Sequence, residues 1–157
     1  MEPSFAKLLA LLADENVRFI VVGGVAVTLH GYVRLTEDVD ILAQSDRSNL
    51  ERLIAALSHF GEGFAMQLAP EDFDDSEGAM RIVEATEGCV VDVFTRMSGS
   101  RYDDVVSDAG TFRLNGHKIR FASTPTLIAW KEVSFREKDR LDAHALRKLL
   151  SAPTAFD

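Results

Sequence analysis

The chain has 157 residues, of which 46% are hydrophobic and 27% are charged, and this length suits one domain with a sizeable core. Its 17 Lys and Arg residues are outnumbered by 25 Asp and Glu residues, so the formal net charge is −8. That balance argues against general duplex DNA binding, which needs a basic footprint that displaces counterions. It does not exclude a nucleic-acid substrate, because bound metal or a local basic patch can reverse the field at one site.

The first part of the chain predicts a helix, a buried strand and a second helix. Apolar residues recur at helical spacing over residues 5–12. Residues 19–22 are continuously apolar and predict a buried strand, which ends in the tight turn Gly23-Gly24. We expect a further helix over residues 25–30, directly after the glycines.

The middle of the chain predicts a strand, a helix and a loop. Residues 37–43 alternate acidic and apolar side chains, as a strand does. Ser48, followed three residues later by Glu51, matches a capping box, and apolar residues over 50–60 then lie on one helical face. Residues 70–78 are acidic and polar, which indicates a mobile surface loop.

The second half predicts two pairs of strands and two C-terminal helices. Short apolar segments bounded by turn residues indicate strands at 80–84, 89–94, 111–114 and 118–121, while residues 96–110 look irregular. The last two strands flank Asn115-Gly116, a dipeptide that suits a type I′ hairpin turn. Thr124 followed by Pro125 predicts a helix start, and a final helix covers about 138–150.

This order of elements predicts an α/β (α+β) fold with a mixed β-sheet flanked by helices. We expect a single domain over residues 1–157, with a core at about 17–122 and C-terminal helices at about 124–150. Cys89 is the only cysteine, so it cannot form an internal disulfide, and its apolar neighbours indicate burial. The N-terminus lacks the basic region of a signal peptide, and no apolar run approaches about 18 residues. A cytoplasmic protein without membrane contact is therefore expected.

Three aspartates carry the chemistry that the sequence suggests. Asp38 and Asp40 are one residue apart in a strand pattern, so both project to the same face about 7 Å apart at the backbone. Like charges so close repel unless a cation lies between them, and carboxylate oxygens suit Mg²⁺. Asp92 lies at the centre of an apolar strand, where a carboxylate is costly unless it is paired or metal-bound. If that strand neighbours the first, the three acids converge and can hold two ions, Mg²⁺ or alternatively Mn²⁺.

Two glycines can supply contacts to phosphate, which the acids cannot make. At a strand-to-helix turn, Gly23 and Gly24 would let the backbone approach a phosphate, and the helix that follows offers free N–H groups. Each signal taken separately has a plainer interpretation. The glycines can form an ordinary turn, Asp38 and Asp40 can lie on a solvated edge, and Asp92 can be a core acid with its own partners.

The joint spacing of these residues resembles the DNA polymerase β-like nucleotidyltransferase superfamily. The matching elements are Val22-Gly23-Gly24, thirteen intervening residues, Asp38-Val39-Asp40-Ile41, and the later apolar strand around Asp92. Residues 24–40 are similar to a small prokaryotic branch related to AbiEii-type toxin–antitoxin nucleotidyltransferases, in which His-Gly-x-x-Arg-x-Thr-x-Asp-x-Asp recurs. The resemblance covers roughly residues 5–150.

The resemblance implies an enzyme that transfers a nucleoside monophosphate from an NTP to an acceptor hydroxyl on tRNA, protein or a small molecule. It implies that Asp38, Asp40 and Asp92 are catalytic metal ligands, with Asp92 as ligand or base. The candidate nucleotide-binding and phosphate-binding residues are Gly23, Gly24, Arg34, Thr36 and Lys131. Two further residues, Lys138 and Asp142, match a lysine–aspartate element of that branch, although a solvated helix surface explains them equally well.

Other interpretations stay open at this point. Arg34 and Thr36 can brace the loop rather than bind phosphate. The whole chain can be a catalytically silent interaction protein that retains the fold, one half of a toxin–antitoxin pair with a cognate partner protein. A metal-dependent phosphohydrolase would use similar acids, but the sequence lacks an obvious cluster of His and Asp ligands for it.

Overall fold

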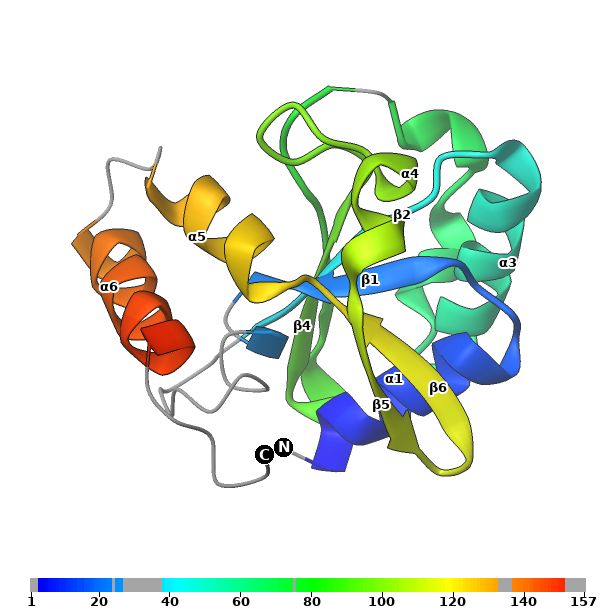
Figure 1. Cartoon of the computed structure of the whole chain (residues 1–157). Coiled ribbons are helices and arrows are strands. Elements are labelled where there is room, and N and C mark those ends of the chain that lie inside the picture. Colours follow the sequence, from blue (N-terminus) through cyan, green and yellow to red (C-terminus); the bar gives the residue numbers. More distant parts are fainter. Residues whose placement is uncertain (1–2, 24, 27–37, 75, 133–136, 152–157) are drawn as a thin grey trace.

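A six-stranded mixed β-sheet with helices beside it forms the structure, a computed structural model that describes residues 3–23, 25–26, 38–74, 76–132 and 137–151 (Figure 1). The helices are α1 (Pro3–Asp14), α3 (Arg47–Leu57), α4 (Tyr102–Val105), α5 (Thr124–Glu132) and α6 (Glu137–Ser151). The strands are β1 (Phe19–Val22), β2 (Asp38–Ala43), β3 (Met80–Glu84), β4 (Cys89–Phe94), β5 (Gly110–Leu114) and β6 (His117–Phe121). The predicted fold class, a mixed sheet flanked by helices and followed by C-terminal helices, is confirmed.

The strand order is β3-β4-β2-β1-β6-β5, and the strand directions decide which residues meet. β1 runs antiparallel to β2 and parallel to β6, while β2 runs parallel to β4. β1 and β6 therefore end where β2 and β4 begin. We call this the acid end of the sheet, because Asp38 begins β2 there. At the opposite end, β1 begins at Phe19 and β6 begins at His117.

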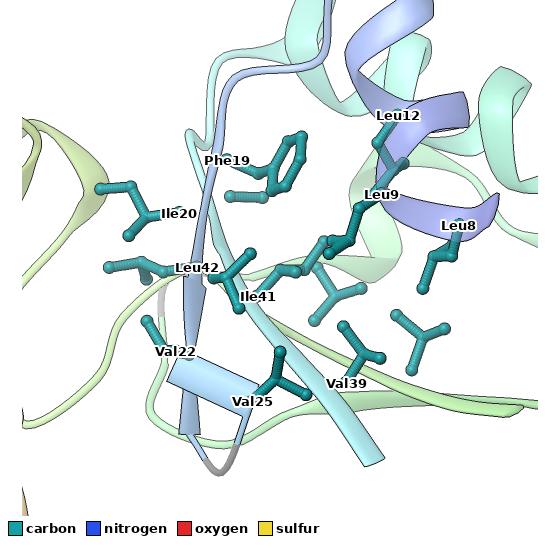
Figure 2. Packing of buried hydrophobic residues seen from close by; sticks show 14 of the residues in the cluster. Leu8, Leu9, Leu12, Phe19, Ile20, Val22, Val25, Val39, Ile41 and Leu42 are labelled. Atoms are coloured by element: carbon teal, nitrogen blue, oxygen red, sulfur yellow. The ribbon is translucent and has the colours of Figure 1, made fainter. Parts of the chain in front are cut away.

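The two central strands bury both of their faces. Figure 2 shows Phe19 and Ile41 pointing toward the leucines of α1, while Ile20 and Leu42 point to the other face. These leucines, Leu8, Leu9 and Leu12, are fully buried, and each contributes about 1.5–3 kcal/mol by leaving water. Because side chains alternate along β2, Asp40 projects with Leu42, away from α1.

A buried asparagine joins α3 to the two central strands. The side chain of Asn49 is fully buried, and its Oδ1 accepts the backbone N–H of Arg18 at 2.7 Å. Its Nδ2 donates to the carbonyl oxygens of Arg18 at 3.0 Å and of Gln44 at 2.8 Å. The amide thus satisfies backbone groups just before β1 and just after β2, beside the backbone hydrogen bond that Gln44 N–H donates to the carbonyl oxygen of Arg18 at 3.1 Å.

The predicted capping box at Ser48 is wrong. Helix α3 begins at Arg47, its N-cap residue is Asp46, and that residue makes no side-chain capping hydrogen bond. The anchored Asn49 already lies in the first turn, so Ser48 is an exposed helical residue rather than a cap. The helix also ends at Leu57, three residues before the predicted Phe60.

Replacing Asn49 by alanine is expected to lower the free energy of unfolding by about 2–4 kcal/mol, because it removes three hydrogen bonds to the backbone and leaves buried backbone groups unpaired. Ser48→Ala, one position earlier and exposed, should change it by less than about 0.5 kcal/mol. Urea unfolding of both variants measures the difference. Equal stability of the two variants would contradict the anchoring role.

Other expectations from the sequence meet the structure with mixed results. The hairpin turn is confirmed, since Asn115 (φ 51°) and Gly116 (φ 81°) both adopt left-handed conformations. The segment predicted to be irregular contains α4 and a 3-10 turn at Val106–Asp108. The polar loop after α3 includes a 3-10 turn at Pro70–Asp72, and its mobility stays a prediction.

Cys89 is buried as predicted, with 2% of its surface exposed. Burial and neighbouring acids raise the pKa of its thiol to about 11. Val25 and Ala26 are helical, while residues 27–30 of the expected second helix lie outside the described residues. Within the described ranges, no helix combines the length and the apolar character that crossing a membrane requires.

Candidate metal centre

The three predicted acids meet at the acid end of the sheet. Asp40 lies directly opposite Asp92 in the parallel register of β2 and β4. Asp38 precedes Asp40 by two residues, so it shares the same face. One carboxylate oxygen from each of the three lies within 4.8 Å of the others. The side chain of Asp92 is buried, and the other two acids are half-buried.

Gly23 closes one side of this cluster because it carries no side chain. It follows β1 with φ +67°, a left-handed conformation that glycine adopts without strain. Val22 pairs with Asp40 across β1 and β2, which brings the turn against that carboxylate. A Cβ at Gly23 would lie 2.1 Å from Oδ2 of Asp40, so any side chain would displace the acid. A phosphate-binding role for Gly23 stays a prediction, and Gly24 lies outside the described residues.

Arg81, which was not among the residues predicted from the sequence, completes the cluster. Its Nε donates to Oδ1 of Asp92 at 2.9 Å and its Nη2 donates to Oδ2 of the same carboxylate at 3.0 Å. Nη2 also donates to Oδ2 of Asp38 at 3.1 Å. These acids, Asp92 foremost and then Asp38 and Asp40, raise the pKa of Arg81 above its ordinary value. The arginine side chain is 60% exposed, so its guanidinium can leave the acids for solvent without crossing the core.

A signal for Arg81 is nevertheless present in the sequence. The sequence predicts strands at 80–84 and 89–94 with a connecting turn, and antiparallel pairing across that turn places Arg81 opposite Asp92. The register Arg81, Asp92, Asp40 and Val22 then runs straight across β3, β4, β2 and β1. The pairings of β4 with β2 and of β2 with β1 depend on the strand order, which local sequence patterns do not predict.

The donor set of the acid cluster fits a hard divalent cation. Carboxylate oxygens are the ligands that Mg²⁺ and Mn²⁺ prefer in proteins. Three negative groups so close require a positive charge, and the guanidinium of Arg81 supplies one from the protein itself. Arg81, which donates hydrogen bonds to two of the three acids, supplies positive charge to the cluster, as a bound metal ion would.

Arg81→Gln is expected to tighten Mn²⁺ binding several-fold, because the protein's own cation no longer competes for Asp92 and Asp38. The same variant should unfold at a lower temperature in EDTA, since a buried carboxylate loses its counter-charge. Calorimetric titration with MnCl₂ and thermal unfolding measure the two effects. Arg113→Gln is the matched control, because Arg113 lies on β5 at the other edge of the sheet. Weaker Mn²⁺ binding in Arg81→Gln than in wild type would contradict the idea that Arg81 and the metal ion compete for the acids.

The remaining predicted site residues are only partly described. Arg34 and Thr36 lie outside the described residues. Lys131 belongs to α5, and Lys138 and Asp142 belong to α6, but their side chains are not described. Helix α5 starts just after β6, which runs parallel to β1, so it begins at the acid end. Figure 1 shows α5 and α6 together on the other side of the strands from α1 and α3.

A solved structure shares this arrangement of sheet and helices. A provisionally assigned nucleotidyltransferase from Thermotoga maritima matches 96% of this chain and 94% of its own, with 19% sequence identity and a TM-score of 0.55. This chain has a nucleotidyltransferase-like fold. An antigenic nucleotidyltransferase-like protein from Paracoccidioides brasiliensis matches 96% of this chain and 78% of its own, at 16% identity and a TM-score of 0.49. No family model and no curated protein matches the sequence.

Proposed function

We propose that this chain is a metal-dependent nucleotidyltransferase, which moves a nucleoside monophosphate from an NTP to an acceptor hydroxyl. The observation that carries the proposal is the convergence of Asp38, Asp40 and Asp92 within 4.8 Å, with Gly23 packed against Asp40. A nucleotidyltransferase-like fold and the hard oxygen donor set support it. The unit we assign to this function spans residues 1–157.

Asp38 and Asp40 would hold divalent ions, Mg²⁺ or Mn²⁺, and Asp92 would complete the site as a further ligand or as a base. When bound there, two such ions supply charge neutralisation for the triphosphate and Lewis-acid polarisation of its oxygens. As a base, Asp92 would take the proton of the acceptor hydroxyl, whose oxygen then attacks the α-phosphorus as pyrophosphate leaves. Its position in β4 places it directly opposite Asp40 of β2.

Cationic and amide groups of the chain would hold the triphosphate. Gly23 and Gly24 would bring backbone N–H groups to the phosphates. Arg81, once released from Asp92 and Asp38, has the exposure to pair with a phosphate oxygen. Arg34, Thr36 and Lys131 are proposed as further phosphate contacts.

The acceptor is proposed from the resemblance of residues 24–40 to the AbiEii-type branch. That resemblance favours a tRNA, protein or small-molecule hydroxyl, and a role in a toxin–antitoxin pair with a cognate partner protein. Base and acceptor selection depend on the shape of the pocket rather than on the fold.

The test is Mg²⁺-dependent incorporation of label from α-labelled NTPs into candidate tRNA, protein and small-molecule acceptors. Wild type should label at least one acceptor, and an Asp38→Ala/Asp40→Ala variant should label none. Omitting Mg²⁺ should have the same effect as the double substitution. Identical labelling by wild type and the variant would overturn the proposal.

A second candidate, a catalytically silent interaction protein, is favoured by one observation. Arg81 already pairs with two of the three acids, so part of the repulsion between them is offset without any ligand. Calorimetry with each NTP in the presence of Mg²⁺ separates the candidates. Metal-dependent nucleotide binding supports the transferase, and its absence supports the interaction protein.

A further inference from the structure

A second charged region lies at the opposite end of the sheet from the acids. A cavity of about 610 Å³ opens where α1 ends, β1 and β6 begin, and α3 passes. Its basic lining consists of Arg18, Arg52, Lys118 and Arg120, and His117 also lines it. No acidic side chain of the described chain lines it. Four permanent positive charges in one cavity are unexpected in a chain whose net charge is −8.

The four arginine and lysine charges of this cavity have no ion-pair partner among the described residues. Arg18 donates through Nη1 to Oε1 of Gln44 at 3.2 Å, and Arg52 donates through Nη2 to Oδ1 of Asn49 at 3.4 Å. Both acceptors are neutral amides. Among the described residues, neither Lys118 nor Arg120 has an ion-pair partner. Like charges held together without counter-ions repel, which costs stability unless an anion joins them.

Arg52 gives independent evidence that, within the described residues, this cavity lacks an acceptor for one of its hydrogen-bond donors. Its Nε is buried from solvent and has no hydrogen-bond acceptor among the described residues. A buried donor left unpaired typically costs about 1–3 kcal/mol, so its retention needs a reason. An anion in the cavity would let this guanidinium turn and satisfy its donors.

We infer that this cavity binds a compact ligand bearing two or more phosphate groups. A cavity of this size is in the range of small-molecule sites, which is roughly 300–1,000 Å³. Arginine and lysine are the side chains that recognise phosphate, arginine through paired N–H donors. The ligand would lie about 10 Å from the acid cluster, the span of β1 from Phe19 to Val22, and so would not share it.

The rim of the cavity favours a compact ligand over a nucleic-acid strand. Asp14 and Glu15 are exposed and directly follow Ala13, which lines the cavity. Asp14 also lies 3.4 Å from Nε2 of His117. An extended phosphate backbone leaving the cavity on this side would meet these acids, whereas a di- or triphosphate can stay within the basic lining.

The test is calorimetric titration of the whole chain with inorganic tripolyphosphate and with ATP, both in EDTA so that the acid cluster holds no metal. Wild type should bind both. If ATP binds more tightly than tripolyphosphate, the nucleoside is also recognised. If the two bind equally well, the phosphate groups are sufficient. Either result supports the site. Lys118→Gln and Arg120→Gln should each weaken binding by roughly 10-fold or more. Lys118 is exposed, so its variant keeps the test valid if Arg120→Gln folds poorly.

Two control variants show whether binding is specific to this cavity. Lys148→Gln removes an equal charge from the exposed surface of α6 and should bind as wild type does. Asp40→Asn should also bind normally, because the inference does not depend on the acid cluster. Absent binding, equal binding by every variant, or loss in Asp40→Asn would overturn the inference. So would a single-stranded RNA oligonucleotide that binds through Lys118 and Arg120 and is not displaced by tripolyphosphate.

Discussion

Asp40→Asn should weaken Mg²⁺ binding by about 100-fold or more, since one unit charge at ligand distance is worth several kcal/mol even in a partly solvated site. Nucleotidyl transfer should fall with it. Asp40 is the informative acid because Asp92 and Asp38, the two acids that hydrogen-bond Arg81, stay in place. Asparagine preserves the shape of the side chain, so the sheet should fold as before.

The stability of this variant should move in the other direction. Without divalent ions, one carboxylate fewer means less repulsion, so Asp40→Asn should unfold at the same temperature as wild type or above it. Added Mg²⁺ should then stabilise wild type alone. Asp46→Asn is the matched control, since Asp46 is exposed and makes no side-chain capping bond. Wild-type Mg²⁺ affinity in Asp40→Asn, or an equal loss in Asp46→Asn, would show that the cluster is not the metal site.

Gly23→Ala should damage both stability and metal binding. The left-handed conformation alone costs alanine about 1–2 kcal/mol. Its Cβ would also lie 2.1 Å from Oδ2 of Asp40, so that carboxylate or the turn must shift. A displacement of this order at a reacting site lowers activity by roughly 10- to 100-fold. We expect a loss of similar size in Mg²⁺ affinity, measured by calorimetry.

Gly88→Ala isolates the backbone strain from the clash. Gly88 has φ +60°, almost the value of Gly23, but a Cβ there would meet no atom within 4 Å. Both variants should lose stability in urea unfolding, with the larger loss in Gly23→Ala. Only Gly23→Ala should lose Mg²⁺ affinity. If the two variants bind Mg²⁺ equally well, close packing of the turn on Asp40 has no part in the site.

Sequence patterns predicted the elements that hold the site, but not all of its members. The strands at 19–22 and 89–94 follow from short apolar segments bounded by turn residues. The shared face of Asp38 and Asp40 follows from the alternation of side chains along any strand. The segment around Asn49 matches a capping box, but a local motif does not reveal that the Asn49 amide instead satisfies the backbone of two strands.

By itself, the sequence determined all six strand segments and the longer helices at the two ends of the chain, and that the first two acids point the same way. These properties depend on neighbours a few residues apart, where the periodicity of apolar side chains acts directly. Only the tertiary structure decided that β4 lies beside β2, so that Asp92 meets Asp40 and Arg81 reaches both Asp92 and Asp38. It likewise gathered basic residues from β6, α3 and the segment before β1 around one cavity. Strand order is set by how the whole chain buries its apolar faces, and a local sequence pattern does not predict that burial.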